Sequence, residues 1–137
     1  MARKAFADHL AAAGLNLVLA ARSAGKLDAL GQALAGSHGI SYRAVTVDLS
    51  DPAGATALLA ATDDLDIGLL VSNAGSARPG PLLDQPLDDL HRRFTLNAVT
   101  HLDLVHAFAG RFVARGRGGI VLTSALGAFQ GLPNMVE

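Results

Sequence analysis

The sequence has no cysteine and no tryptophan, and only 4% of its 137 residues are aromatic. Without cysteine, the chain can form neither a disulfide framework nor a thiolate metal site. The shortage of aromatic side chains means that a core has to be built from Ala, Leu and Val, which suits close packing of helices on a sheet. The length is that of one domain with enough material to bury such a core.

The chain also lacks an excess of charge of either sign and any long apolar run. Lys and Arg total 11 against 12 for Asp and Glu, so there is no electrostatic basis for binding nucleic acid. No apolar stretch approaches the ~20 residues of a membrane span. Asp8 and His9 interrupt the first apolar stretch, where a signal peptide would be continuous. We therefore expect a cytoplasmic protein with no nucleic-acid or membrane partner.

Apolar spacing predicts helices and strands in alternation, which is typical of βα units around a parallel sheet. We expect one α/β domain over residues 1–137, with short buried strands that end in Gly, Asn or Asp. The expected elements are a helix at 4–13, a strand at 15–21, a helix capped by Ser23, a strand at 41–47, a helix that begins at Ser50-Asp51-Pro52, a strand at 67–72, a helix at 86–115 and a strand at 120–124.

Local signals refine several of these elements. Pro52 is expected at the first helical position, and Asp84 is expected to cap the long helix. Residues 36–39 and 127–137 are expected to be loops. In the first helix, the buried face is predicted to consist of Phe6, Leu10 and Ala13. In the helix at 86–115 a single stripe is predicted, formed by Leu87, Leu90, Phe94, Ala98, Leu102, Val105, Phe108 and Phe112.

Five short motifs stand at the ends of the expected strands and within the long helix. They are Ala21-Arg22, Asp48-Leu49, Ser72-Asn73-Ala74-Gly75, Leu96-Asn97-Ala98 and the run from Gly118 to Ser124. Taken singly, each has an ordinary structural interpretation, since Gly, Asn and Asp are common in turns. Ligands of open α/β sheets bind at the carboxyl ends of the strands, where most of these motifs fall.

In this order and spacing, the motifs from Ala5 to Pro133 resemble those of the classical short-chain dehydrogenases/reductases. The resemblance implies a Rossmann-like parallel sheet with flanking helices and an NADP cofactor. It implies that Arg22 pairs with the 2′-phosphate, as the bidentate guanidinium can. It also implies that Asp48 and Leu49 flank the adenine.

The other motifs are similar to the family's cofactor and catalytic residues. Asn73, Ala74 and Gly75 match its Asn-Ala-Gly loop, and Asn97 matches the helix Asn of its catalytic tetrad. Ser124 lies beside the position of the catalytic Ser, which the register assigns to Ala125. Neighbouring strand residues face opposite sides, so Ser124 is a poor substitute.

The resemblance also implies that the chain is truncated at both ends. The family's first strand, which is central in the sheet order 3-2-1-4-5, and its Gly-rich turn would precede Ala5. Its Tyr and Lys, which carry out the proton transfer, would follow Glu137. We therefore expect a segment of an NADP-preferring reductase for a small carbonyl or alcohol substrate, impaired or inactive in this form. The alternative is a catalytically dead remnant that acts only as an interaction module or has no function.

Two further expectations concern partners and metals. The apolar stripe of the helix at 86–115 is expected to cause self-association, because the resemblance implies that it packs at a subunit interface. The five histidines show no spacing typical of zinc ligands and are expected to be surface residues; they are His9, His38, His91, His101 and His106. We expect Arg111, Arg115 and Arg117 to stabilise the end of a helix.

Overall fold

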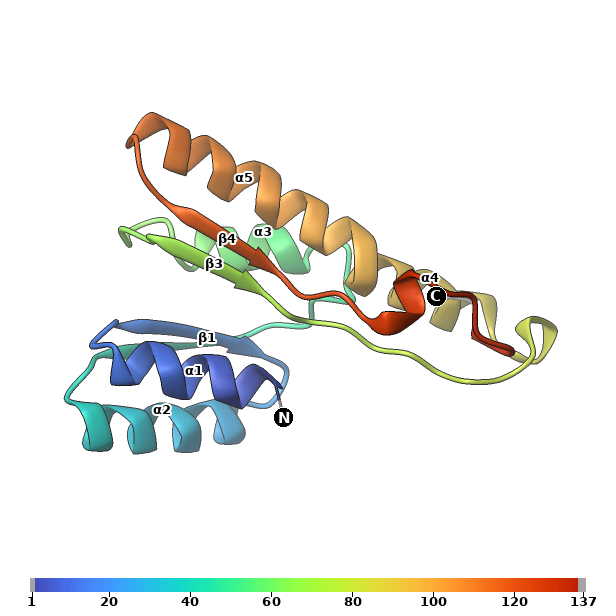
Figure 1. Cartoon of the computed structure of the whole chain (residues 1–137), viewed down its shortest axis with the longest axis horizontal. Helices are drawn as coiled ribbons and strands as arrows, with labels where there is room; N and C mark the ends of the chain where they lie inside the picture. The colour runs from blue at the N-terminus through green and yellow to red at the C-terminus, as the bar shows by residue number, and fades with distance from the viewer. Residues whose placement is uncertain (1, 136–137) are drawn as a thin grey trace. The chain divides into compact units, whose positions relative to one another are not determined.

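The computed structural model describes residues 2–135, in which helices and strands alternate (Figure 1). The elements are α1 (Ala2–Ala12), β1 (Leu17–Ala21), α2 (Ala24–His38), β2 (Tyr42–Thr46), α3 (Gly54–Ala60), β3 (Leu69–Ser72), η1 (Leu82–Asp84), α4 (Leu87–Phe94), η2 (Thr95–Val99), α5 (Thr100–Ala114), β4 (Gly119–Leu122) and η3 (Leu126–Ala128). The chain divides into two compact units, residues 1–48 and 49–137. The expectation of a single domain over 1–137 stays a prediction.

The first unit consists of one parallel strand pair with two helices against it. Strand β1 pairs with β2 from Leu17 opposite Tyr42 to Ala21 opposite Thr46. Helices α1 and α2 pack on this pair and on each other. Their buried side chains are small, as the composition requires: Ala7 and Ala11 of α1 meet Leu34 of α2.

The predicted face of α1 was wrong. Phe6 and Leu10 are only half-buried and Ala13 is exposed, whereas Ala7 and Ala11 are buried. The alanines allow α1 to approach its neighbours closely, so the helix turns its small residues inward.

Helix α2 runs further than the sequence suggested. Residues 36–38, expected in a loop, complete the last turn, and Gly39 ends the helix in the left-handed conformation with φ 67°. Its N–H donates to the carbonyl of Ala35 at 2.8 Å. Glycine is the usual residue at such an end because it adopts positive φ without strain.

The second unit is built around α5, which packs against α3, β3 and β4. Strand β3 pairs in parallel with β4, Leu69 opposite Gly119 and Ser72 opposite Leu122. The buried side chains of α5 repeat every four residues, at Thr100, Leu104, Phe108 and Phe112. The core therefore lies between this face of α5 and the strand pair.

The expected single helix at 86–115 is interrupted by one π-helical turn. Helix α4 passes into η2 and then into α5 without leaving the helical region of the backbone. A π turn has more residues than an α turn, so it rotates the side chains that follow relative to those that precede it. The predicted stripe is split as a result. Phe108 and Phe112 are buried, but Leu87, Phe94 and Leu102 are 64%, 64% and 67% exposed.

Two predicted helix starts are also shifted. Helix α3 begins at Gly54, not at Pro52, because the Asp51 carboxylate accepts the N–H of Ala53 at 2.8 Å and closes a separate turn first. Asp84 lies in η1 and does not cap α4. The first backbone acceptor of α4 is the Pro86 carbonyl, to which the Leu90 N–H donates at 3.2 Å.

The sheet topology agrees with the expected α/β class. Both pairs are parallel. In the expected order 3-2-1-4-5, β1 and β2 correspond to strands 2 and 3, and β3 and β4 correspond to strands 4 and 5. The two observed pairs are therefore the two that flank the central strand of that order. Within residues 2–135, no strand pairs with the second edge of β1 or of β3. The fold is Rossmann-like, with short parallel strands and flanking helices.

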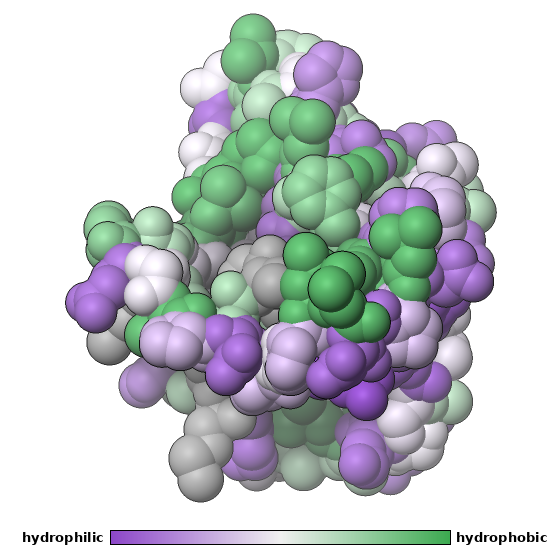
Figure 2. All heavy atoms as spheres, turned by 90° about the vertical axis from the view of Figure 1, so that its right-hand side faces the viewer, coloured by the Kyte–Doolittle hydropathy of each residue, from purple (hydrophilic) through white to green (hydrophobic). Residues whose placement is uncertain are grey.

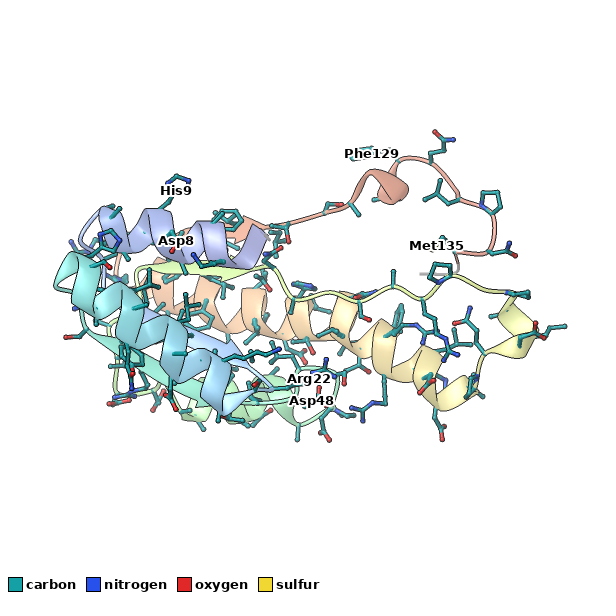
Figure 3. All side chains as sticks on the ribbon, turned by 90° about the horizontal axis from the view of Figure 1, so that it is seen from below. Asp8, His9, Arg22, Asp48, Phe129 and Met135 are labelled. Carbon is teal, nitrogen blue, oxygen red and sulfur yellow. The ribbon has the colours of Figure 1, made fainter. Side chains whose placement is uncertain are left out.

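The last described segment leaves β4 two residues earlier than predicted, at Leu122, and makes the short turn η3. Figure 3 shows Phe129 on this segment and Met135 where it returns to the loop that precedes α4. The return is fixed by Gly80 N–H, which donates to the carbonyl of Asn134 at 2.9 Å. None of the helices described here has the length and apolar content of a membrane span.

Candidate functional site

Arg22 and Asp48 lie at the carboxyl end of the first strand pair. The parallel register places Ala21 opposite Thr46, so the two residues follow neighbouring strands at the same edge (Figure 3). Val47 N–H donates to the carbonyl of Ala21 at 3.0 Å and extends the ladder to this point. Arg22 is exposed and Asp48 is half-buried. A guanidinium in this position is accessible to an anionic group.

Leu49, the first residue of the second unit, is held by the start of α5. The Thr100 hydroxyl donates to the Leu49 carbonyl at 2.7 Å, and Arg92 donates to the Ser50 hydroxyl at 2.8 Å. Thr100 is buried and Leu49 is half-buried. The backbone that follows Asp48 is therefore fixed by side chains from α4 and α5.

Residues 73–76, here called the 73–76 loop, follow β3 and are held by Asn97 from the π turn. The Asn97 amide accepts the N–H of Ser76 at 3.0 Å and donates to the Ser76 carbonyl at 2.8 Å. A Cβ added to Gly75 would lie 3.6 Å from the Asn97 amide oxygen. The predicted residues Asn73, Ala74, Gly75 and Asn97 are thus brought together in the second unit.

His101, one helical turn after Asn97, contacts the same loop. One ring nitrogen, Nε2, lies 2.8 Å from the Ala74 carbonyl oxygen, and the other, Nδ1, lies 2.5 Å from the Ser72 hydroxyl. The prediction that all five histidines are surface residues is therefore wrong for His101, which is half-buried, and is confirmed for the other four. The signal available in the sequence was its spacing of four from Asn97, which places both on one helix face.

The Ser72–His101 contact has the form of a nucleophile and a base, but its surroundings do not suit catalysis. Ser72 is only 5% exposed, because its side chain turns inward from β3 toward α5. A nucleophile has to reach a substrate carbon, and a buried hydroxyl does not. The contact therefore belongs to the support of the loop.

Thr123, the residue after β4, also binds the start of this loop. The Thr123 N–H donates to the Ser72 carbonyl at 3.2 Å, and the Thr123 hydroxyl donates to the Asn73 amide oxygen. Ser124 and Ala125 come next, past the end of β4, and both are exposed. Ser124 is thus adjacent in sequence to a residue bonded to Asn73, but its own predicted role in catalysis stays a prediction.

Arg111 in α5 and Arg115 directly after it bind the segment that precedes β3, and the expected stabilisation of the helix end by Arg111, Arg115 and Arg117 stays a prediction. Arg115 donates to the Ile67 carbonyl at 2.6 Å and pairs with Asp66 at 2.8 Å. Arg111 pairs with Asp63 at 2.9 Å. Within the part of the chain that the structure describes, no three His, Asp or Glu side chains are grouped closely enough to hold a metal ion.

The predicted site residues therefore form two groups, each at the carboxyl ends of a strand pair. Arg22 and Asp48 belong to the first unit, and Leu49, the 73–76 loop and Asn97 belong to the second. In parallel α/β sheets, ligands usually bind at the carboxyl ends of the strands.

Comparisons with known proteins bear on the family of the chain. The model of the short chain dehydrogenase family matches residues 4–137. The 7beta-hydroxysteroid dehydrogenase of Collinsella aerofaciens is 30% identical over 130 residues, which cover 95% of this chain and 49% of that protein. The 1-deoxy-11-beta-hydroxypentalenate dehydrogenase of Streptomyces avermitilis is 35% identical, covering 87% of this chain and 50% of that protein.

Solved structures give the same result. A short-chain dehydrogenase from Sphingobium yanoikuyae in complex with NADPH has a TM-score of 0.86 and 35% identity, over 91% of this chain and 50% of that one. The chain spans about half the length of the curated relatives it matches. Because the family model covers almost all of the sequence, the chain belongs to the short-chain dehydrogenase family.

Proposed function

We propose that the chain supplies the cofactor-binding half of an NADP-preferring oxidoreductase that acts on a small carbonyl or alcohol substrate. The observation that carries the proposal is the 73–76 loop, which Asn97 and His101 hold at the carboxyl end of β3. Arg22, exposed after β1, supports the preference for NADP. A solved relative with 35% identity is in complex with NADPH.

The residues present fit part of this cofactor. The Arg22 guanidinium can bind a 2′-phosphate through two hydrogen bonds, and the Asp48 carboxylate can accept a hydrogen bond from the adenine. The 73–76 loop offers a short backbone with little side-chain bulk, so a ring system can approach it closely. When bound, the nicotinamide supplies hydride transfer, which no side chain can perform.

The chain's own residues bind and orient rather than transfer protons. Asn97 and His101 fix the loop, and Thr100 fixes the backbone at Leu49, so these groups do not have to be ordered upon binding. Ala125 carries no hydroxyl to polarise a substrate oxygen. We therefore propose that the 137 residues bind cofactor but turn over substrate poorly or not at all.

A titration with NADPH tests the proposal. Nicotinamide fluorescence and the melting temperature of the chain are followed together, and both should rise with NADPH. Replacing Arg22 with Ala should weaken NADPH binding about tenfold and leave NADH binding unchanged, because only NADPH carries the 2′-phosphate. Lys26→Ala, an exposed cation in α2, is the matched control. No binding by the unaltered chain would overturn the proposal.

The second candidate is a catalytically inactive remnant that acts as an interaction module. Ala125 favours it, as does a broad apolar surface on the second unit, where hydrophobic side chains gather in the view of Figure 2. The exposed large hydrophobic side chains of the second unit include Leu83, Leu87, Phe94, Leu102 and Phe129. NADPH-dependent turnover by the purified chain would exclude this candidate.

We also propose, from the same surface, that the chain self-associates through residues 86–115. Phe94 and Leu102 expose two thirds of their area, and burial of such side chains stabilises association. Light scattering should give a mass above that of the 14.0 kDa chain. Phe94→Glu should restore the monomer, whereas His91→Glu, an exposed polar position in α4, should not.

The cytoplasmic location stays a prediction.

A further inference from the structure

His101 is a residue of the site that the sequence motifs did not single out. Its ring lies between β3 and the 73–76 loop, with Nδ1 at 2.5 Å from the Ser72 hydroxyl oxygen and Nε2 at 2.8 Å from the Ala74 carbonyl oxygen. Ser72 is buried and is the last residue of β3. One ring therefore connects the rigid end of the strand to the second residue of the loop.

The chemistry of the two partners fixes the proton on the ring. A carbonyl oxygen can only accept, so Nε2 must carry the hydrogen that it donates to Ala74. In the neutral ring Nδ1 is then the acceptor, and the Ser72 hydroxyl donates to it. The Ala74 carbonyl thereby selects the Nε2–H tautomer, and the Ser72 hydroxyl, which can donate or accept, is compatible with it.

Asn97 and His101 act on the loop from one helix face. They are four residues apart, and together they bind the Ala74 carbonyl and both backbone groups of Ser76. Gly75, between these two anchors, has its backbone direction set from each side. The connection from β3 to η1 runs over residues 73–81, and Asn97 and His101 bind the first part of it, directly after the strand.

We propose that His101 is a positioning residue that holds the 73–76 loop in the conformation that receives the cofactor. The inference rests on the proposed function for the identity of the ligand. Its structural part, the loop held through the Nε2–H tautomer, is independent of any ligand. His101 touches no reacting atom and acts only through the backbone of Ala74.

Two variants separate the contacts. His101→Leu removes both hydrogen bonds, whereas His101→Gln keeps an amide donor for the Ala74 carbonyl. His106, an exposed histidine of the same helix, provides the matched controls His106→Leu and His106→Gln. All variants are made in the full 137-residue chain.

The first measurement needs no cofactor. Nitrogen NMR of the imidazoles should show His101 as the Nε2–H tautomer, and backbone amides in 73–76 should exchange about tenfold faster in His101→Leu while those of 104–112 are unchanged. The Gln variant should be intermediate. An Nδ1–H tautomer, or equal exchange in the two Leu variants, would overturn the proposal.

The second measurement is NADPH affinity. His101→Leu should weaken binding about tenfold, and His101→Gln less. His101→Leu should also lower the melting temperature of the free chain relative to His106→Leu, because the buried Ser72 hydroxyl loses its partner. Equal affinity in His101→Leu and His106→Leu would overturn the role in binding. If the unaltered chain bound no NADPH, the proposed function would fail, and the exchange measurement would decide separately whether His101 holds the loop.

Discussion

The Asn97 side-chain amide makes two hydrogen bonds with the backbone of Ser76. It donates to the Ser76 carbonyl and accepts from the Ser76 N–H, the pattern that two paired strand residues form. A mid-helix Asn is unfavourable unless it finds such a local partner. The π turn around it places this side chain beside the loop. A residue that costs helix stability is thereby used to shape a neighbouring segment.

Replacing Asn97 with Ala should therefore lower the free energy of unfolding by about 1–2 kcal/mol, the net value of two hydrogen bonds. Urea denaturation followed by far-ultraviolet circular dichroism measures it. Gln32→Ala, an exposed amide in α2, is the control and should change little. Equal effects of the two substitutions would show that the bonds to Ser76 contribute nothing measurable.

Arg22 and His101 differ in how far their places in the site could be predicted from the sequence. The position of Arg22 after a strand was predictable, because an apolar run followed by a charged residue marks a strand end. The contacts of His101 were not, because its spacing of four from Asn97 places both residues on one helix face but does not say which segment that face meets. The residues of the 73–76 loop were found from the sequence by type and order, but the support of this loop by His101 and Thr123 needed coordinates.

At the scale of elements, helix α2 meets strand β2 at Gly31. An added Cβ there would lie 2.2 Å from the Tyr42 ring, closer than atoms can approach. The ring of the single tyrosine, which the sequence placed in a strand, therefore packs directly against Gly31. The contact explains why a residue of low helix propensity stands within α2.

Gly31→Ala should accordingly destabilise the chain by about 1–3 kcal/mol through overpacking. Gly36→Ala in the same helix, where nothing lies within 4 Å of the new Cβ, should stabilise it by about 0.5–1 kcal/mol through helix propensity. Thermal or urea unfolding distinguishes the two. Opposite signs are expected, and a destabilised Gly36→Ala would contradict the packing explanation.

The end of α5 is joined to the segment before β3 by Arg115, whose side chain is 22% exposed. Arg115→Ala removes the bonds to the Ile67 carbonyl and Asp66, so it should cost about 1–2 kcal/mol. Arg117→Ala, at an exposed position, should have almost no effect. Comparable losses in both variants, measured by urea unfolding, would refute the assignment.

Sequence periodicity predicted the order of the helices and strands of the whole chain but missed details set by backbone geometry. The α/β class and the parallel pairs followed from short apolar runs between helical segments. The face of α1 was missed because Phe6 and Leu10 are more hydrophobic than the alanines that are buried. Periodicity also assumes an unbroken helix, so the predicted stripe through 86–115 could not anticipate η2.

At the scale of the whole molecule, the division at residue 48 has a measurable consequence. Tyr42 is the only tyrosine and there is no tryptophan, so intrinsic fluorescence at tyrosine wavelengths reports the first unit alone. Circular dichroism reports both units. The two probes should give urea transitions that do not coincide, which is the standard sign of departure from two-state unfolding. Superimposable transitions would show that the units unfold as one.

The π turn η2 is equivalent to one residue inserted into a continuous α-helix. Deleting one residue there, such as Ala98, would rotate everything beyond it by about 100° relative to α4. Leu104 and Phe108 would leave the core, or Arg93 would lose its contact with Gln85. The extra residue lets the two halves of this helix bind different parts of the chain: Arg93 in α4 binds Gln85, and Leu104 and Phe108 in α5 pack in the core. An unbroken α-helix would not direct both sets of side chains correctly.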